Sequence, residues 1–289
     1  MITSICREGH FMILETFHPL HLSLLAVTVL LPFALHFLFR KKSEVWKTNF
    51  LIVLCAVNLL IFFVYKAFLS VDAEFLRIDG AVRFNWLNEL PIQLCNINLF
   101  LIPIGLLTKK RFLLGFSFII APLGAMMALL FPEPAFHGFS LFVPRIFGFY
   151  LTHALIFVCG MCLATLGFYR PAVRDFPGIV ASFFVISVGA HLVNLLLRAT
   201  ALCDRANYFF TYGADISILN LFWRWIPYPF FYELPSLVIL LFYMALVYAS
   251  CSVMAFRSMS RHFARFTSRI SAIFSSKLAV FCSMRRRRS

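Results

Sequence analysis

Seven long apolar stretches run through this sequence and constrain its fold more than any other feature. Each is about 18 to 25 residues long, which is the length that a helix needs to cross the hydrocarbon core of a bilayer. Only 13% of all residues are charged, too few to cover the surface of a soluble domain. The sequence therefore predicts an all-α, polytopic membrane helical bundle, with seven transmembrane helices at 19–39, 50–69, 90–107, 112–131, 146–168, 179–197 and 234–256.

Basic residues alternate across these predicted spans. Segments on one side hold 18 of the 26 Lys and Arg residues, with Glu44 and Asp175 as their only acids, whereas the other side holds 8 basic residues and 10 acids. Lys and Arg collect in short cytoplasmic loops, so we predict that the N-terminus lies outside and the C-terminus is cytoplasmic. We expect no nucleic-acid partner, because the basic residues do not share one soluble face.

Two segments outside the spans carry further information. We expect a seven-span membrane domain over 1–256 and a basic amphipathic cytoplasmic tail over 257–289, whose arginines and apolar residues fall on opposite arcs of a helical wheel. Such a helix lies on a membrane and binds anionic lipid headgroups, although a disordered tail is the alternative. The outer stretch 198–233 is too long for a simple connector, and its Tyr and Trp residues indicate an ordered segment at headgroup level.

Polar side chains gather in the outer half of the predicted bundle. At helical rise, Cys95 lies roughly 8 to 12 Å below the outer end of the third stretch, and His153 lies roughly 10 Å deep in the fifth. Polar groups are costly in hydrocarbon, so this one-sided enrichment predicts a polar cavity that opens toward the outside. The side chains concerned are His21, Gln93, Cys95, Asn96, His153 and His191.

Cys95 and His153 are the pair that we expect to carry chemistry. A thiol in a low-dielectric site needs a base to become a nucleophile, and a histidine at equal depth supplies one. We predict acyl transfer in which Cys95 attacks a lipid ester and His153 moves the proton, without a cofactor. The structural alternatives are an inert packing thiol and an interhelical hydrogen bond. We expect no metal site, because no two histidines have ligand spacing on one helix.

Other residues around the pair have expected supporting roles. We predict that His191 and Asn207 orient the reacting groups or stabilise developing charge. Cys159 and Cys162 have the spacing of a redox pair, but within a membrane helix we interpret them as packing residues. The full set of predicted substrate-binding or orienting residues is His21, Gln93, Asn96, His191, Asn207 and Tyr208.

Several short motifs resemble those of a known family. They are His21, Leu90-Pro91-Ile92-Gln93-Leu94-Cys95, His153, Arg170-Pro171 and Asn207-Tyr208. Through them the chain resembles the YwaF-type bacterial integral membrane proteins, which are related to the mammalian multi-span acyltransferase that remodels ether phospholipids. The resemblance implies a helical membrane fold, a Cys95 and His153 pair that moves a fatty acyl chain between phospholipids, and a cytoplasmic (inner) membrane if the chain is bacterial. Where the family often has a histidine just before the cysteine, this chain has Gln93.

Two other classes of function remain open at this level. The same outer cavity is compatible with a small-solute transporter or channel, although the sequence has no internal repeat of the kind that marks many secondary transporters. A non-catalytic membrane scaffold, whose basic tail recruits a partner, is the other. Loss of lipid turnover without the Cys95 thiol would separate the enzyme from both.

Overall fold

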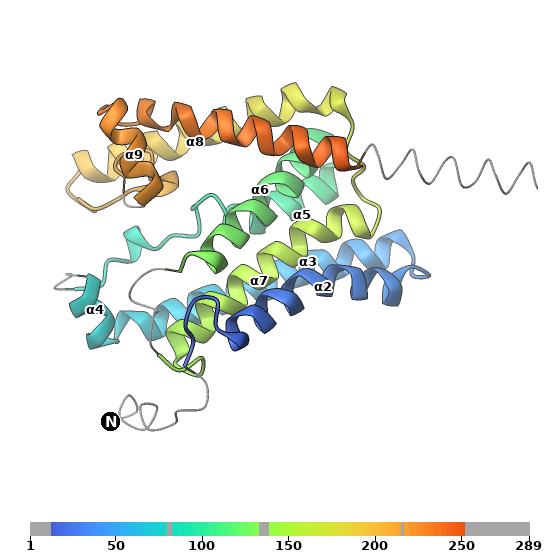
Figure 1. Ribbon diagram of the computed structural model, residues 1–289, viewed down its shortest axis with the longest axis horizontal. Coiled ribbons are helices and arrows are strands. Elements are labelled where there is room, and N and C mark those ends of the chain that lie inside the picture. Colours follow the sequence, from blue (N-terminus) through green and yellow to red (C-terminus); the bar gives the residue numbers. More distant parts are fainter. Residues whose placement is uncertain (1–12, 80–82, 133–138, 215–216, 252–289) are drawn as a thin grey trace, which may run out of the picture. The chain divides into compact units, whose positions relative to one another are not determined.

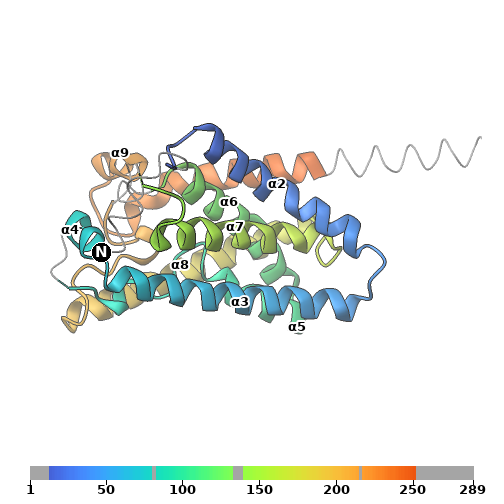
Figure 2. The same ribbon diagram turned by 90° about the horizontal axis from the view of Figure 1, so that it is seen from below.

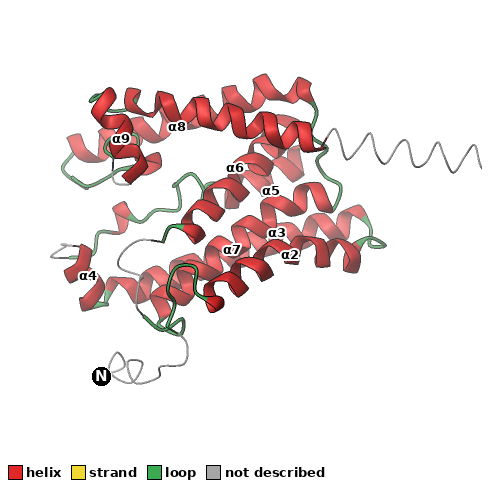
Figure 3. Ribbon diagram, in the orientation of Figure 1, coloured by secondary structure: helices red, strands yellow, loops and turns green. Residues whose placement is uncertain are grey.

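The chain is an all-helical membrane bundle. The computed structural model describes residues 13–79, 83–132, 139–214 and 217–251, and these form helices and connecting segments without a β-sheet (Figures 1 and 3). The described helices, apart from the last, are α2 (Pro19–Phe39), α3 (Glu44–Ser70), α4 (Ala73–Asp79), α5 (Asn98–Thr108), α6 (Arg111–Leu130), α7 (Pro144–Thr165), α8 (Phe176–Ala199) and α9 (Ser217–Trp225). The predicted fold class is thereby confirmed.

Six of the described helices are long and apolar enough to cross a membrane. They include α2, which has the predicted bounds, and a last helix over Phe231–Cys251. The chain is therefore an integral multi-pass membrane protein. The direction in which it crosses the membrane stays a prediction.

The predicted third span differs from the structure. The prediction had a continuous helix over 90–107, but α5 begins only at Asn98 and has 11 residues, preceded by an irregular segment over 89–97. Pro91 lacks a backbone N–H and disfavours helical geometry in the residue before it, which helps to explain why no helix forms there. Cys95 lies in this irregular segment, so its depth cannot be counted at helical rise.

Helix α7 is the centre of the first part of the chain. It packs against α2, α3 and α6, as two perpendicular views show (Figures 1 and 2). Small residues allow this close approach: a Cβ on Gly148 would lie 2.1 Å from Tyr65 Cβ of α3, and one on Gly160 would lie 2.7 Å from Pro122 Cδ of α6. Close backbone contacts of this kind hold membrane helices together.

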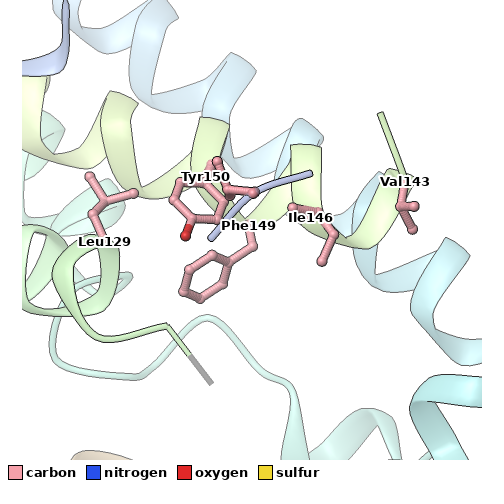
Figure 4. Close-up of a cluster of buried hydrophobic side chains, with 6 residues drawn as sticks. Leu129, Val143, Ile146, Phe149 and Tyr150 are labelled. Carbon is pink, nitrogen blue, oxygen red and sulfur yellow. The ribbon is translucent and has the colours of Figure 1, made fainter. Parts of the chain in front are cut away.

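An apolar cluster ties the start of α7 to the end of α6. Leu129 of α6 lies beside the Phe149 and Tyr150 rings of α7, and Ile146 and Val143 continue the row toward the start of that helix (Figure 4). All of these side chains are at most 7% exposed. The cluster places the first two turns of α7, directly before His153.

The chain divides into two units, 1–236 and 237–289. The described part of the second unit, up to Cys251, is helical. The predicted amphipathic tail over 257–289 and its contacts with anionic headgroups lie outside the described residues and stay a prediction.

Candidate functional site

The Cys95 thiol and the His153 imidazole are in contact. Cys95 Sγ lies 3.6 Å from His153 Nε2, within hydrogen-bond reach for sulfur. His153 belongs to α7 and is 7% exposed, whereas Cys95 is partly buried in the irregular segment before α5. Two residues that are far apart in the sequence thus have the geometry of a nucleophile and its general base. Their catalytic role stays a prediction.

The contact of the second ring nitrogen of His153 determines the tautomer of the ring. His153 Nδ1 lies 2.8 Å from the Phe149 carbonyl oxygen, one turn earlier in α7. A carbonyl oxygen can only accept a hydrogen bond, so Nδ1 carries the proton and Nε2 keeps its lone pair. The thiol then donates to Nε2, which is the arrangement that a general base needs.

The backbone around Cys95 is irregular and is satisfied by protein groups. Asn98 Nδ2 donates to the carbonyls of Leu94, at 2.9 Å, and Cys95, at 3.2 Å. Gly124 of α6 lies directly behind, where a Cβ would come within 3.3 Å of Cys95 Cβ. Non-helical backbone is tolerated at membrane depth only where protein or a water-filled cavity surrounds it, so these contacts make the segment 89–97 permissible there.

The outer stretch clamps this segment from the other side. The Tyr208 hydroxyl donates to the Leu87 carbonyl and accepts from Leu90 N at 3.2 Å. Gln93 Oε1 accepts from Phe209 N at 2.9 Å, and Phe209 has a φ of 56°, in the left-handed region that a bulky side chain rarely occupies. Burial raises the pKa of Tyr208 to about 12, so its hydroxyl stays protonated and able to donate.

The clamp is itself held by α8. Asn194 is fully buried and bonds both backbone groups of Tyr208: its Nδ2 donates to the carbonyl and its Oδ1 accepts from the N–H, each at 2.8 Å. Asn194 Nδ2 also donates to Thr211 Oγ1 at 2.9 Å, and His191 Nδ1 lies 3.1 Å from the same hydroxyl. Asn207 Oδ1 accepts from the N–H groups of Tyr212 and Gly213. The structure thus uses the predicted orienting residues His191, Asn207 and Tyr208 to build the clamp.

The remaining predicted site residues have different settings. Asn96, next to the thiol, is 6% exposed, and within the described part of the chain its side-chain oxygen has no hydrogen-bond partner. His21 is fully buried: Nδ1 accepts from Phe17 N at 2.9 Å, and Nε2 donates to the Leu129 carbonyl at 2.8 Å. His21 therefore links α2 to the end of α6, and its predicted role toward substrate has no direct support.

The sequence argument did not include Lys66 and Glu89 in the site. Lys66 Nζ forms an ion pair with Glu89 Oε2, and the two side chains are only 12% and 20% exposed. One sequence signal could have indicated this pair. Lys66 lies inside the apolar stretch 50–69, and the acid Glu89 directly precedes the next stretch. Among the described residues, no group of three His, Cys, Asp or Glu side chains has the geometry of a metal site.

The chain matches the model of the TMEM164 family over residues 14–274. The chain belongs to the TMEM164 family. No curated protein and no solved structure matches it.

The family match corrects the resemblance drawn from short motifs. TMEM164 is a eukaryotic membrane family, so the YwaF-type bacterial interpretation is wrong. The motifs were short and tolerant of substitution, and a match over residues 14–274 outweighs them. The conditional expectation of a bacterial inner membrane loses its basis, and so does the activity inferred through that resemblance. The function of this TMEM164-family chain therefore has to be argued from its own residues.

Proposed function

We propose that this TMEM164-family chain is a membrane-embedded acyltransferase or lipid-ester hydrolase that moves a fatty acyl group through Cys95 and His153. The observation that carries the proposal is the 3.6 Å contact between Cys95 Sγ and His153 Nε2, with Nδ1 of the same ring held by the Phe149 carbonyl. Nucleophile, base and orienting group form the sequence of contacts typical of covalent acyl transfer. No cofactor is required by this chemistry.

In the first half of the reaction, Cys95 takes the acyl group. The thiol proton passes to His153 Nε2, and the sulfur attacks the ester carbonyl carbon, whose π electrons move to the oxygen. When this oxyanion collapses, the ester C–O bond breaks, and the leaving alkoxide takes the proton from His153. A thioester on Cys95 remains, and the first product is an alcohol.

In the second half, an acceptor takes the acyl group from the thioester. The acceptor hydroxyl gives its proton to His153 Nε2, and its oxygen attacks the thioester carbonyl. Cys95 leaves as a thiolate and recovers the proton. A lipid hydroxyl as acceptor makes the chain a transferase, and water makes it a hydrolase.

The position of the pair favours a lipid substrate. Both residues lie between helices that are long enough to span a bilayer, and Cys95 belongs to irregular backbone on the side of the bundle where α3 ends and α7 begins. Many apolar side chains of α2 and α3 remain exposed, as expected for a surface that faces lipid tails. A membrane ester can reach such a site without leaving the bilayer.

The test is acyl transfer by the full chain in vesicles that contain a phospholipid with a labelled acyl chain and a lysophospholipid acceptor. We expect Cys95→Ser to reduce the labelled product to background. Cys159→Ser is the matched control, because it removes a fully buried thiol of α7 that does not contact His153 in the described contacts, and it should retain the activity. A hydroxylamine-sensitive acyl adduct on Cys95 would identify the intermediate.

Product formation by Cys95→Ser at the wild-type rate would refute the proposal. A solute transporter or a scaffold would instead form no labelled product in either the wild type or Cys95→Ser, which would refute the proposal equally. Product that contains free fatty acid rather than a new ester would indicate the hydrolase form of the same chemistry.

A further inference from the structure

Lys66 is a buried ammonium close to the proposed reacting groups. Besides its ion pair with Glu89, it lies over the Tyr65 ring, 4.9 Å from the centroid, and near the Phe62 ring at 5.6 Å. An ionised lysine in such surroundings is costly, and charges inside membrane bundles usually have a function. The described contacts of Lys66 explain how its buried charge is stabilised. They do not explain why the chain has a charge there.

The ion pair joins α3, which packs against the helix of His153, to the segment that carries Cys95. On α3, the neighbouring Tyr65 packs against Gly148 of α7, five residues before His153. Glu89 begins the irregular segment that leads to Cys95. Through these two contacts the Lys66 ammonium lies in the same part of the bundle as the Cys95 thiol and the His153 ring.

We propose that Lys66 is the cation that stabilises negative charge at the site, first on the Cys95 sulfur and then on the oxyanion formed during acyl transfer, and that Glu89 moderates its strength. The inference rests on the proposed function. A fixed positive charge in a low-dielectric site lowers the energy of a developing anion far more than it would in water. His191 and Asn207, which the sequence placed in this role, are engaged in the clamp instead. Arg145, another buried cation, is paired with Asp72 at 2.5 Å.

Opposite effects of the two partners distinguish this role from a structural ion pair. Lys66→Met removes the ammonium and leaves the Glu89 carboxylate without its partner, whereas Glu89→Gln leaves the ammonium without its counter-ion. If the charges act on Cys95, the first variant makes its thiolate scarcer and the second makes it more abundant. A pair that only holds the fold predicts changes in the same direction for both.

The experiment is alkylation of Cys95 by iodoacetamide at a fixed pH of about 8, near the ordinary range for a thiol, in the full chain in lipid nanodiscs. The modified Cys95 peptide is quantified by mass spectrometry. Alkylation forms an S–C bond, expels iodide and releases the thiol proton, and its rate follows the thiolate fraction. We expect Lys66→Met to slow it about tenfold and Glu89→Gln to accelerate it several-fold. Lys66→Arg, which keeps the charge, should stay within about threefold of wild type.

The double variant with Lys66→Met and Glu89→Gln keeps the test decisive if a single variant fails to fold. It contains no buried unpaired charge, and it should alkylate more slowly than Glu89→Gln but faster than Lys66→Met. Thermal unfolding of each variant identifies those that fold. In acyl transfer, Lys66→Met should lower kcat about 100-fold with little change in KM, because the charge acts on the transition state.

Equal rates in all folded variants, or slower alkylation in both single variants, would overturn the inference. Alkylation needs no lipid substrate, so this failure differs from that of the proposed function, which shows as full lipid turnover by Cys95→Ser.

Discussion

Two settings of cysteine within the same bundle differ sharply. Cys95 lies on irregular backbone, is partly exposed and faces a histidine nitrogen. Cys159 lies within α7, is fully buried and interacts with the thiol of Cys55 on α3, itself only 1% exposed. The first thiol has a base to take its proton and the second has only weak partners and hydrocarbon. We therefore expect the reactivity of each thiol to follow its local backbone and neighbours.

The largest expected effect comes from removing the base that distinguishes the two settings. His153→Gln keeps a side chain of similar reach but cannot accept the thiol proton as imidazole does. We expect acyl transfer to fall about 10³-fold, within the range for loss of a general base. Labelled product formation in vesicles measures this, and His36→Gln is the control, because His36 Nδ1 bonds only the Thr165 carbonyl in the described contacts. Equal losses of activity in both variants would contradict the assignment of His153 as the general base.

A second prediction compares the two thiols directly. In the folded chain, iodoacetamide should modify Cys95 at least about tenfold faster than Cys159, since only the former is accessible and paired with a base. Peptide mass spectrometry during a time course measures both rates in one sample. The difference should vanish after unfolding in detergent and denaturant. Similar rates in the folded chain would contradict the comparison.

A smaller effect tests the clamp that keeps Cys95 in its setting. Tyr208→Phe removes the hydroxyl that bonds Leu87 and Leu90, at a cost of about 1 kcal/mol in positioning, so turnover should fall about fivefold. Tyr228→Phe is the matched control, because Tyr228 is 65% exposed, and it should leave turnover unchanged. If Tyr208→Phe has full activity, the clamp does not position the thiol.

The smallest effect concerns the buried thiol itself. Cys159→Ser places a hydroxyl in the core of α7, where it can bond a carbonyl one turn earlier, so we expect a loss of about 1 kcal/mol in stability. Thermal unfolding measures this loss, with turnover per folded molecule unchanged. A loss of turnover comparable to that of Cys95→Ser would show that the second setting is also functional.

The sequence predicted the bounds of the first span correctly, but it predicted a continuous helix in the third, where the structure has none. Helix α2 has the predicted bounds because a continuous apolar run and a proline at its first turn specify it locally. The third stretch is also apolar overall, yet its first half is irregular. Hydropathy measures the preference for lipid and does not detect where side chains such as Asn98 and Tyr208 replace helical hydrogen bonds.

Part of the candidate site was predicted from the sequence, but one assumption behind that prediction was wrong. The depth estimate that paired Cys95 with His153 assumed a helix around Cys95, whereas the contact arises through an irregular segment. The ion pair of Lys66 with Glu89 was missed because the two residues are 23 positions apart in the sequence and no local pattern links them. The role of His191 was not foreseen either, since its contact with Thr211 depends on how the outer stretch folds back.

By itself, the sequence determined that this chain is a helical membrane protein, because span length and hydropathy are properties of consecutive residues. Only the tertiary structure decided which thiol meets an imidazole, which ring nitrogen faces it and which cation lies nearby. These contacts join α3, α7 and the segment before α5, and they depend on close packing at Gly148 and Gly124. No local pattern encodes that packing, since it is the joint result of several helices meeting at once.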